Sequence, residues 1–261
     1  MIDIKTPQEI KVMQKGGRIL SEVMAQILKE INVGVSELEI DTLADELIRK
    51  KGAEPGFKKV DGYKHAICIS TNDVSVHGIP TDYKFKTNDV VGIDMGVFYK
   101  GFHTDMSETR RVSELKTQNS KLKTNKNDND IDIFLETGKK ALNEAIKQAK
   151  VGNHIGDISK TIQDIVEDRG YSVVRTLVGH GVGRQLHEDP EIPGFLSEPI
   201  EKTPLLKEGM TIAIEVIYNM GGPDLKLDKD GWTLRTEDGS LAGLYERTIA
   251  VTKNGPQILT P

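Results

Sequence analysis

The chain has 261 residues, of which 37% are hydrophobic and 29% charged, so it can bury a sizeable core as one large domain or two small ones. Its single cysteine excludes an internal disulfide and a thiolate zinc cluster, and any metal must therefore be held by nitrogen and oxygen ligands. A net charge of −5 argues against nucleic acid as the main partner.

Signals for export or membrane insertion are not apparent in the sequence. The N-terminal stretch MIDIKTPQEIKVMQKGG lacks the apolar run of a signal peptide, and no stretch approaches the ~20 apolar residues that span a membrane. We therefore expect a soluble, cytoplasmic protein with no membrane partner. The sparing use of cysteine agrees with a reducing compartment.

Two helices are predicted before any strand. The first spans residues 7 to about 31 and opens with Thr6 and Glu9, which are typical of a capping box. The second opens at Ser36, where the same capping pattern recurs, and Gly52 marks its end. A helix pair is therefore expected at the start of the chain.

The rest of the chain combines strands, a polar insertion and a second helix pair. Residues 113–130 have no periodic apolar pattern and are expected to form a flexible surface insertion. A helix from about 132 to 149 follows, and then a helix opened by Asp157 and closed by Gly170. The strand-like runs are AICIS (66–70), VVGIDMGVFY (90–99), SVVRTLV (172–178), GMTIAIEVIY (209–218) and ERTIAVT (246–252). This order is typical of an α+β fold with an antiparallel sheet.

The two helix pairs are related by an internal repeat. A shift of 118 positions superposes Gly34 on Gly152 and Gly52 on Gly170, together with several apolar positions nearby. The repeat predicts two similar halves, each with a helix pair followed by sheet. A site at the junction of the halves would take residues from both.

Two aspartates occur in strand-like runs that are otherwise apolar enough to be buried. Asp94 lies in VVGIDMGVFY, and Asp105 lies in the following run, FHTDMSE. An unpaired buried carboxylate is costly, so each needs a hydrogen-bonded partner or a metal. If Lys100 and Gly101 close a hairpin, Asp94 faces Ser107 and the two aspartates are diagonal neighbours on one face. A longer turn would change this register.

Two histidines lie seven positions apart in LVGHGVGRQLHEDPEIPG, residues 177–194. Glycine on both sides of His180 indicates that the backbone passes close to another group there. A ligand or catalytic pair with His187, a structural turn and a phosphate loop are all compatible with this stretch alone. The phosphate loop is the least favoured, because the glycines do not match the dinucleotide or P-loop fingerprints.

Two glutamates complete the set of unusual polar residues on strands. Glu215 lies inside TIAIEVIY and Glu246 opens ERTIAVT, and each alone could be a strand residue that faces water. Together with Asp94, Asp105 and His180 they form an oxygen-rich ligand set with one imidazole, which suits a pair of divalent first-row metals. Such a pair would activate a water molecule for hydrolysis.

Six motifs stand out along the chain: HGIP (77–80), IDMGVFYKGFHTD (93–105), GHGVGRQLHEDP (179–190), GMTIAIE (209–215), DGWTLRTEDGS (230–240) and YERTIAVT (245–252). Their order and spacing resemble those of the bacterial-type (type I) methionine aminopeptidases. The resemblance covers nearly the whole chain and implies the pita-bread fold, a pseudo-twofold α+β architecture, with residues 1–261 as a single metallopeptidase domain. It also implies removal of the N-terminal methionine from nascent polypeptides that have a small second residue.

The resemblance assigns metal-binding roles to the polar strand residues. Asp94 would chelate one metal, Asp105 and Glu246 would bridge two metals, and His180 with Glu215 would complete the other site. The cofactor would be two divalent ions, with iron, manganese, cobalt and zinc all compatible with these ligands.

The resemblance also implies which residues act on the substrate. His187 would lie beside the substrate carbonyl and stabilise the tetrahedral intermediate, and His77 would contact the scissile amide nitrogen. Glu215 would additionally relay a proton. Taken alone, His77 in VHGIP would be an ordinary turn residue.

An apolar pocket is needed for the methionine side chain. The resemblance assigns its wall to Tyr63, Cys68, Leu186 and Trp232, with Phe57 and Val60 at matching positions. The chain departs from common family choices at four positions. Aromatic residues are usual in place of Leu186 and Val60, proline in place of Val216, and histidine in place of Arg247. These departures concern the shape of the pocket and the surroundings of the ligands, because all five expected ligands are kept.

Two other functions are compatible with a fold of this kind. A proline-specific peptidase uses the same fold and ligand set but generally carries an extra N-terminal domain. A metal-free binding module of this fold would have lost ligands. We expect instead an aminopeptidase that is a monomer and associates transiently with the ribosome.

Overall fold

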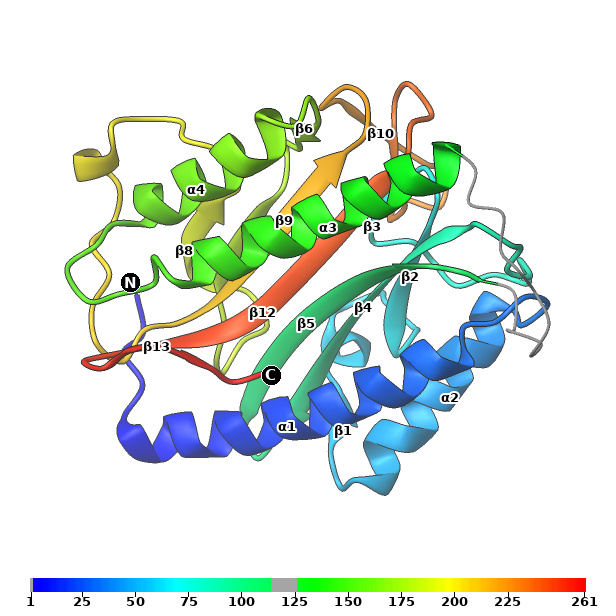
Figure 1. The fold of residues 1–261 in the computed structure, drawn as a ribbon. Coiled ribbons are helices and arrows are strands. Elements are labelled where there is room, and N and C mark those ends of the chain that lie inside the picture. The colour runs from blue at the N-terminus through cyan, green and yellow to red at the C-terminus, as the bar shows by residue number, and fades with distance from the viewer. Residues whose placement is uncertain (1, 114–125) are drawn as a thin grey trace.

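The computed structural model describes residues 2–113 and 126–261 and has a curved sheet with two helix pairs packed against it (Figure 1). The helices are α1 (Pro7–Glu30), α2 (Glu37–Lys50), α3 (Lys126–Ile146) and α4 (Ile155–Glu167), with short 3-10 helices η1 (Phe57–Lys59) and η2 (Ile200–Lys202). The strands are β1 (Glu54–Pro55), β2 (Ile67–Thr71), β3 (Val74–Val76), β4 (Val90–Tyr99), β5 (Phe102–Arg111), β6 (Ser172–Val173), β7 (Val178–Gly181), β8 (Glu188–Pro193), β9 (Thr211–Asn219), β10 (Leu225–Leu227), β11 (Leu234–Thr236), β12 (Ala242–Thr252) and β13 (Gly255–Ile258).

The main sheet is antiparallel, as predicted. Among the described residues ten strands form it, with the order β1-β4-β5-β12-β9-β7-β8 along its main path and with β2, β6 and β13 paired to β4, β9 and β12. Helix α1 packs against β4 and β5, whereas α3 packs against β9 and β12 (Figure 1). Each helix pair therefore covers its own half of the sheet, and β5 meets β12 where the halves join.

The internal repeat is confirmed by the turns that connect and end the helices. Gly34 after α1 and Gly152 after α3 have φ angles of 88° and 93°, in the left-handed region that favours glycine. Gly52 after α2 and Gly170 after α4 have φ angles of 76° and 79°. Equivalent glycines thus end equivalent helices in the two halves, which is the pseudo-twofold architecture expected from the sequence.

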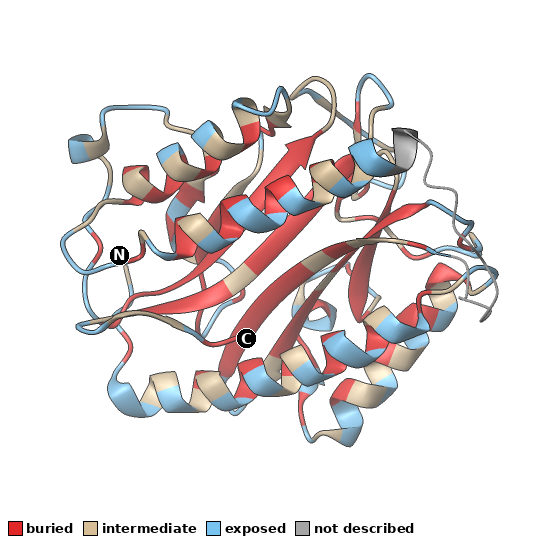
Figure 2. Cartoon of the chain, viewed as in Figure 1, coloured by how far each residue is buried: buried red, intermediate tan, exposed pale blue. Residues whose placement is uncertain are grey.

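The sequence patterns place the first helix pair closely. Thr6 and Ser36 cap α1 and α2, and each helix has the reciprocal capping box predicted from Glu9 and Glu39. The apolar side of each helix faces the sheet, where Leu20, Val23, Ile27, Ile40 and Ile48 are buried with residues of β2 and β4. Figure 2 shows the same division, with exposed residues on the outer helix faces.

The second half differs from the prediction at three boundaries. Helix α3 begins at Lys126 rather than near 132, so residues 126–130 are helical, while residues 114–125 of the expected insertion lie outside the described part of the chain. Helix α4 begins at Ile155, and Asp157 caps it from inside the first turn, where its carboxylate accepts the His154 N–H at 2.7 Å. The run 172–178 divides into β6 and the start of β7, with a bend at residues 175–176 between them, where Arg175 pairs with Glu167.

Candidate metal centre

Five neighbouring strands carry the five residues expected to bind metal. Asp94 lies on β4, Asp105 on β5, His180 on β7, Glu215 on β9 and Glu246 on β12. Because β5, β12, β9 and β7 follow one another in the sheet, residues far apart in the sequence come together across the junction of the two halves.

The hairpin register predicted for the aspartates is confirmed. Asp94 pairs with Ser107 and Gly96 pairs with Asp105, so the two aspartates are diagonal neighbours on the same face. Glu246 is directly opposite Glu215 on β9. The expectation that Glu246 opens its strand is wrong, because β12 begins at Ala242 and places this residue within the sheet.

The donor atoms of these residues converge. One ligand atom each from Asp105, His180 and Glu246 lie within 4.8 Å of one another. His180 Nε2 also lies 3.4 Å from Glu215 Oε1. The group contains the carboxylate oxygens and imidazole nitrogen that divalent transition metals bind.

Several carboxylate oxygens at this point have no hydrogen-bond partner among the described residues. Asp94 Oδ1, Asp105 Oδ1 and Glu246 Oε1 are buried and unpartnered. Asp105 and Glu246 are only 4% and 2% exposed. Leaving such atoms unsatisfied is costly, and cations at their centre would remove the cost. The residues present therefore fit a divalent metal site.

The imidazole of His180 is oriented for metal binding by its own backbone. The Gly181 carbonyl accepts a hydrogen bond from Nδ1 at 2.8 Å, which leaves the lone pair on Nε2 directed towards the carboxylates. Burial, with His187 beside it, lowers the pKa of His180 to about 3. The ring is thus neutral at physiological pH, the form that binds metals.

Thr248 is a structural residue of the site that sequence patterns did not reveal. Its hydroxyl accepts from the Asp105 N–H at 2.9 Å and donates to the Asp105 carbonyl at 2.8 Å. Regular pairing of β5 with β12 is confined to Glu246 and Arg247, opposite Ser107 and Met106. The threonine side chain therefore replaces a backbone partner where the two halves of the sheet separate.

Arg247, one of the departures from common family choices, connects the two ligand strands. Its guanidinium donates to the Ser107 carbonyl at 3.1 Å and to the Glu246 carbonyl at 2.7 Å, and it pairs with Glu108. Val216, another departure, is fully buried beneath the second helix pair. Both residues thus stabilise the strands behind the ligands without contacting the cavity.

Both histidines expected to act on the substrate face the ligands. The ring of His187 packs edge-on against that of His180, with centroids 4.4 Å apart. His77 has a φ angle of 56°, a left-handed conformation that a non-glycine residue adopts only under local constraint. Burial lowers the pKa of each, so both are neutral at pH 7.

A cavity of about 110 Å³ opens directly above the five ligands. Its remaining wall consists of the two histidines and of the predicted apolar residues Phe57, Val60, Tyr63, Cys68, Leu186 and Trp232. Tyr63 holds this wall together, with its ring 5.1 Å from that of Trp232 and its hydroxyl donating to the Ile67 carbonyl at 2.9 Å. The cavity suits a single apolar side chain rather than a large ligand.

A model of the metallopeptidase family M24 matches residues 11–253. The methionine aminopeptidase of Clostridium perfringens is 41% identical over 260 residues, which cover 100% of this chain and 99% of that protein. The chain belongs to the methionine aminopeptidases. The crystal structure of the Thermotoga maritima methionine aminopeptidase, 39% identical, superposes with a TM-score of 0.91 over 100% of this chain and 99% of that chain.

This methionine aminopeptidase has the pita-bread fold, which it shares with longer peptidases. The prolidase of Pyrococcus horikoshii superposes with a TM-score of 0.74 and 26% identity, over 99% of this chain but only 63% of that one. As a member of a metallopeptidase family, the chain depends on divalent metal ions, and the Asp105, His180 and Glu246 group could hold one. In the described part of the chain, no helix has the length and apolar character needed to cross a membrane.

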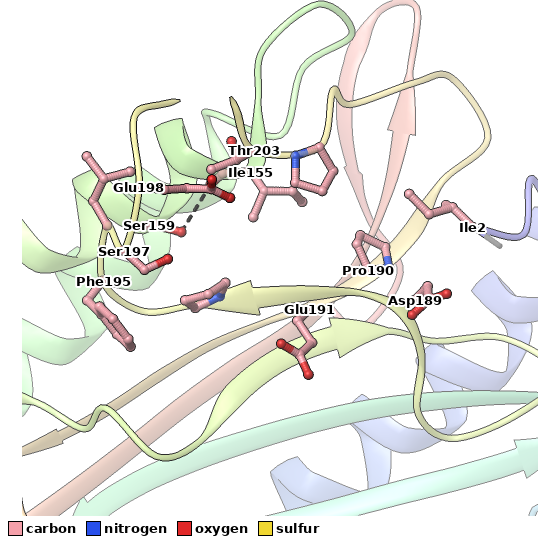
Figure 3. Close-up of a pocket in the computed structure, with 13 residues that line it drawn as sticks. Ile2, Ile155, Ser159, Asp189, Pro190, Glu191, Phe195, Ser197, Glu198 and Thr203 are labelled. Atoms are coloured by element: carbon pink, nitrogen blue, oxygen red, sulfur yellow. Dashed lines mark hydrogen bonds between the residues drawn. The ribbon is translucent and has the colours of Figure 1, made fainter. Parts of the chain in front are cut away.

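Two further pockets lie near the cavity of this methionine aminopeptidase. A groove of about 540 Å³ shares His77, His187 and Glu215 with the cavity and continues outward past Thr176 and Leu177. A pocket of about 480 Å³ lies between β8 and α4 (Figure 3). Among the residues that the structure describes, none of the five expected metal ligands lines the pocket of Figure 3.

The buried carboxyls predict how the stability of the metal-free protein depends on pH. Burial raises the pKa of Asp105 from 3.8 to about 7, and burial with the neighbouring Asp105 charge raises the pKa of Glu215 from 4.5 to about 8. These folded-state pKa values exceed the unfolded ones, so the stability these groups contribute is full below about pH 4 and is lost as pH rises through 7 to 8.

We therefore expect the free energy of unfolding, measured by urea denaturation with a chelator, to fall by at least about 2 kcal/mol between pH 5.5 and pH 8. Added Mn²⁺ should restore more stability at pH 8 than at pH 5.5, because the ligands must lose protons to bind it. A metal-induced stabilisation that is independent of pH would contradict the assignment of these carboxyls as ligands.

Proposed function

We propose that the protein hydrolyses the peptide bond that follows an N-terminal methionine, with two divalent ions held by the five strand residues. One observation carries this proposal: buried, unpartnered carboxylate oxygens form the floor of a small cavity whose upper wall is apolar. The floor suits metal ions, and the wall suits the side chain of one unbranched apolar residue. The names of the relatives point to the same substrate.

In this proposal, Asp94 would hold one ion, Asp105 and Glu246 would be shared by both ions, and His180 with Glu215 would complete the site of the other. The donor atoms of Asp105, His180 and Glu246 converge within 4.8 Å of one another, which supports the proposal that these three residues share the ion held by His180. When bound, the ions lower the pKa of a water molecule enough to supply a nucleophile near neutral pH. Iron, manganese, cobalt and zinc all suit the ligands, and anaerobic reconstitution with each ion would identify the most active form.

Three residues of the cavity would act on the peptide directly. His187 would donate a hydrogen bond to the carbonyl oxygen, where negative charge develops in the transition state. His77 would contact the nitrogen of the scissile bond. Glu215 would accept the proton of the attacking water, which its place beside His180 allows.

The substrate would lie in the cavity and in the groove that opens from it. Tyr63, Cys68, Leu186 and Trp232 would enclose the methionine side chain, and the free amino group would approach Asp94. The following residues would leave through the groove past Thr176 and Leu177, and the enzyme would prefer a small second residue. The physiological substrates would be nascent polypeptides in the cytoplasm, reached by a monomer that associates transiently with the ribosome.

Four peptides test the proposal against its alternatives. The manganese-loaded protein should release methionine from Met-Ala-Ser, but not from Met-Leu-Ser or N-formyl-Met-Ala-Ser, and should leave Ala-Pro intact. Hydrolysis of Ala-Pro instead would indicate a proline-specific peptidase. Absence of any hydrolysis, with no metal bound, would indicate a binding module. Cleavage of the formylated peptide would contradict recognition of the free amino group.

The pocket wall makes a further prediction about substrate tolerance. Leu186 lies where aromatic residues are common, so the pocket should be wide enough for weak activity on norleucine and ethionine peptides. Leu186→Phe should reduce that activity while changing kcat/KM for Met-Ala-Ser by less than roughly tenfold, the scale of a methylene mismatch. Leu227→Phe is the matched control, because Leu227 is 60% exposed and does not line the cavity. An equal loss on all peptides would remove Leu186 from the methionine pocket.

A further inference from the structure

Lys5, in the segment before α1, is a buried lysine. It is 3% exposed, although lysine is almost never buried unless its charge is paired. Its ammonium group forms an ion pair with Glu188, whose side chain is only 11% exposed, and lies 3.2 Å from the exposed Asp3. The pair joins residues that are 183 positions apart, so it is a tertiary contact that no local pattern requires.

The partner of Lys5 closes the loop that carries His187. This loop, residues 183–188, follows β7 and ends at Glu188, the first residue of β8. Glu188 Oε2 pairs with Lys5, while Glu188 Oε1 accepts the Gln185 N–H at 3.0 Å. The carboxylate of Glu188 thus joins the loop to the N-terminal segment. The loop also carries Leu186, which lines the cavity.

The loop is shaped to admit the lysine. A Cβ atom on Gly183 would lie 2.3 Å from Lys5 Cε and 2.6 Å from Lys5 Nζ. The lysine side chain therefore passes directly over the loop backbone, and a side chain at position 183 would displace the ammonium group from this place. The Gly183 carbonyl in turn accepts the His103 N–H of β5 at 2.6 Å, so the same glycine is attached to a ligand strand.

Lys5 is itself fixed to the body of the protein. Its backbone N–H donates to the Gly209 carbonyl at 2.8 Å, just before strand β9, which bears Glu215. A second ion pair, between Glu9 of α1 and Arg184 of the loop, is exposed on the Arg184 side and contributes little. Of the two ion pairs that reach the loop, the buried one is thus the pair that can hold the loop in position.

We propose that Lys5 is a positioning residue: its ion pair with Glu188 holds the 183–188 loop so that His187 stays against His180 and over the substrate carbonyl. The tests of this proposal that measure turnover rest on the proposed function. A displacement of about 1 Å in a catalytic group can cost up to about 100-fold in rate, so a lost ion pair can reduce turnover without removing any group that touches substrate.

The test compares Lys5→Met, Lys5→Arg and Glu188→Gln with the matched control Arg184→Met, which removes the exposed pair from the same loop. Lys5→Met and Glu188→Gln should lower kcat for Met-Ala-Ser by at least about tenfold with full metal content. Lys5→Arg, which keeps the positive charge, should retain most of the activity. The kcat of Arg184→Met should stay within about twofold of that of the parent protein. If Arg184→Met costs as much as Lys5→Met, the specific role of Lys5 is wrong.

The decisive comparison uses the His187→Ala background. There, Lys5→Met should lower the melting temperature as much as it does in the parent protein but should not reduce kcat further, because the group that Lys5 positions is absent. The same fold-loss of kcat in both backgrounds would overturn the proposal. The uncharged pair Lys5→Met with Glu188→Met serves if the single variant does not fold, because it leaves no unpaired buried charge.

A readout independent of activity separates this proposal from the proposed function. In NMR spectra of the zinc-loaded protein, Lys5→Met should shift and broaden the imidazole resonances of His187 and leave those of His154, the N-cap residue of α4, unchanged. Unchanged His187 resonances would overturn the positioning role. A parent protein that releases no methionine would instead overturn the proposed function, and the NMR comparison would still test Lys5.

Discussion

Asp105→Asn is expected to abolish hydrolysis and to remove at least one metal ion from the protein. Asp105 Oδ1 is buried and unpartnered, and the aspartate lies with His180 and Glu246 around a common point. Asparagine keeps the shape but loses the charge and half of the donor capacity. Changes to groups that only support metal ligands cost 10- to 100-fold, so loss of a bridging ligand should leave less than about 1% of kcat/KM.

Metal analysis and methionine release should be measured on the same preparation of this variant. Asp132→Asn is the matched control, because Asp132 is an exposed aspartate that pairs with Arg111 on the surface. The control should keep its metal and its activity. Full metal content with normal turnover in Asp105→Asn would contradict the bridging assignment.

The same substitution should stabilise the metal-free protein, although it abolishes hydrolysis. The charge of Asp105 is one cause of the raised pKa values of Asp94, Glu215 and Glu246. Its removal relieves repulsion among buried carboxylates, so metal-free Asp105→Asn should be more stable than the parent protein at pH 8. A variant that is inactive because it is misfolded would instead be less stable at every pH.

His187→Ala is expected to lower kcat by about 100-fold or more while both metal ions stay bound, the effect of losing one donor to a developing oxyanion. His187 packs edge-on against His180, yet it is outside the group of converging ligand atoms. His187→Gln, which keeps an N–H donor, should recover part of the loss. If metal content falls together with activity, His187 is a ligand and the roles of the two histidines must be exchanged or shared.

The ligand geometry was predictable where local chemistry fixes the chain. Lys100 and Gly101, with φ angles of 48° and 89°, close the two-residue hairpin that sets the register of β4 and β5. Once that register is fixed, Asp94 and Asp105 must share a face. The glycines beside His180 were equally informative, because a Cβ on Gly181 would lie 2.1 Å from the Asp189 carbonyl oxygen of β8.

The contacts that support the ligands were not predictable, because they join distant segments through single side chains. Thr248 satisfies the backbone of Asp105 with its hydroxyl, and nothing in ERTIAVT distinguishes this threonine from any other strand residue. Lys5 lies in the short segment before α1, where no sequence pattern indicates a partner, and only the fold brings Glu188 to it. The early start of α3 was not predicted because residues 126–130, KNDND, include no apolar residue that could show a helical period.

Metal dependence is tested most directly by titrating the metal-free protein with Mn²⁺ under anaerobic conditions while methionine release from Met-Ala-Ser is followed. The proposed mechanism predicts no release without metal, a rise in rate that parallels binding of the ion, and a return to background when a chelator is added. Hydrolysis at the full rate by the metal-free protein would contradict it.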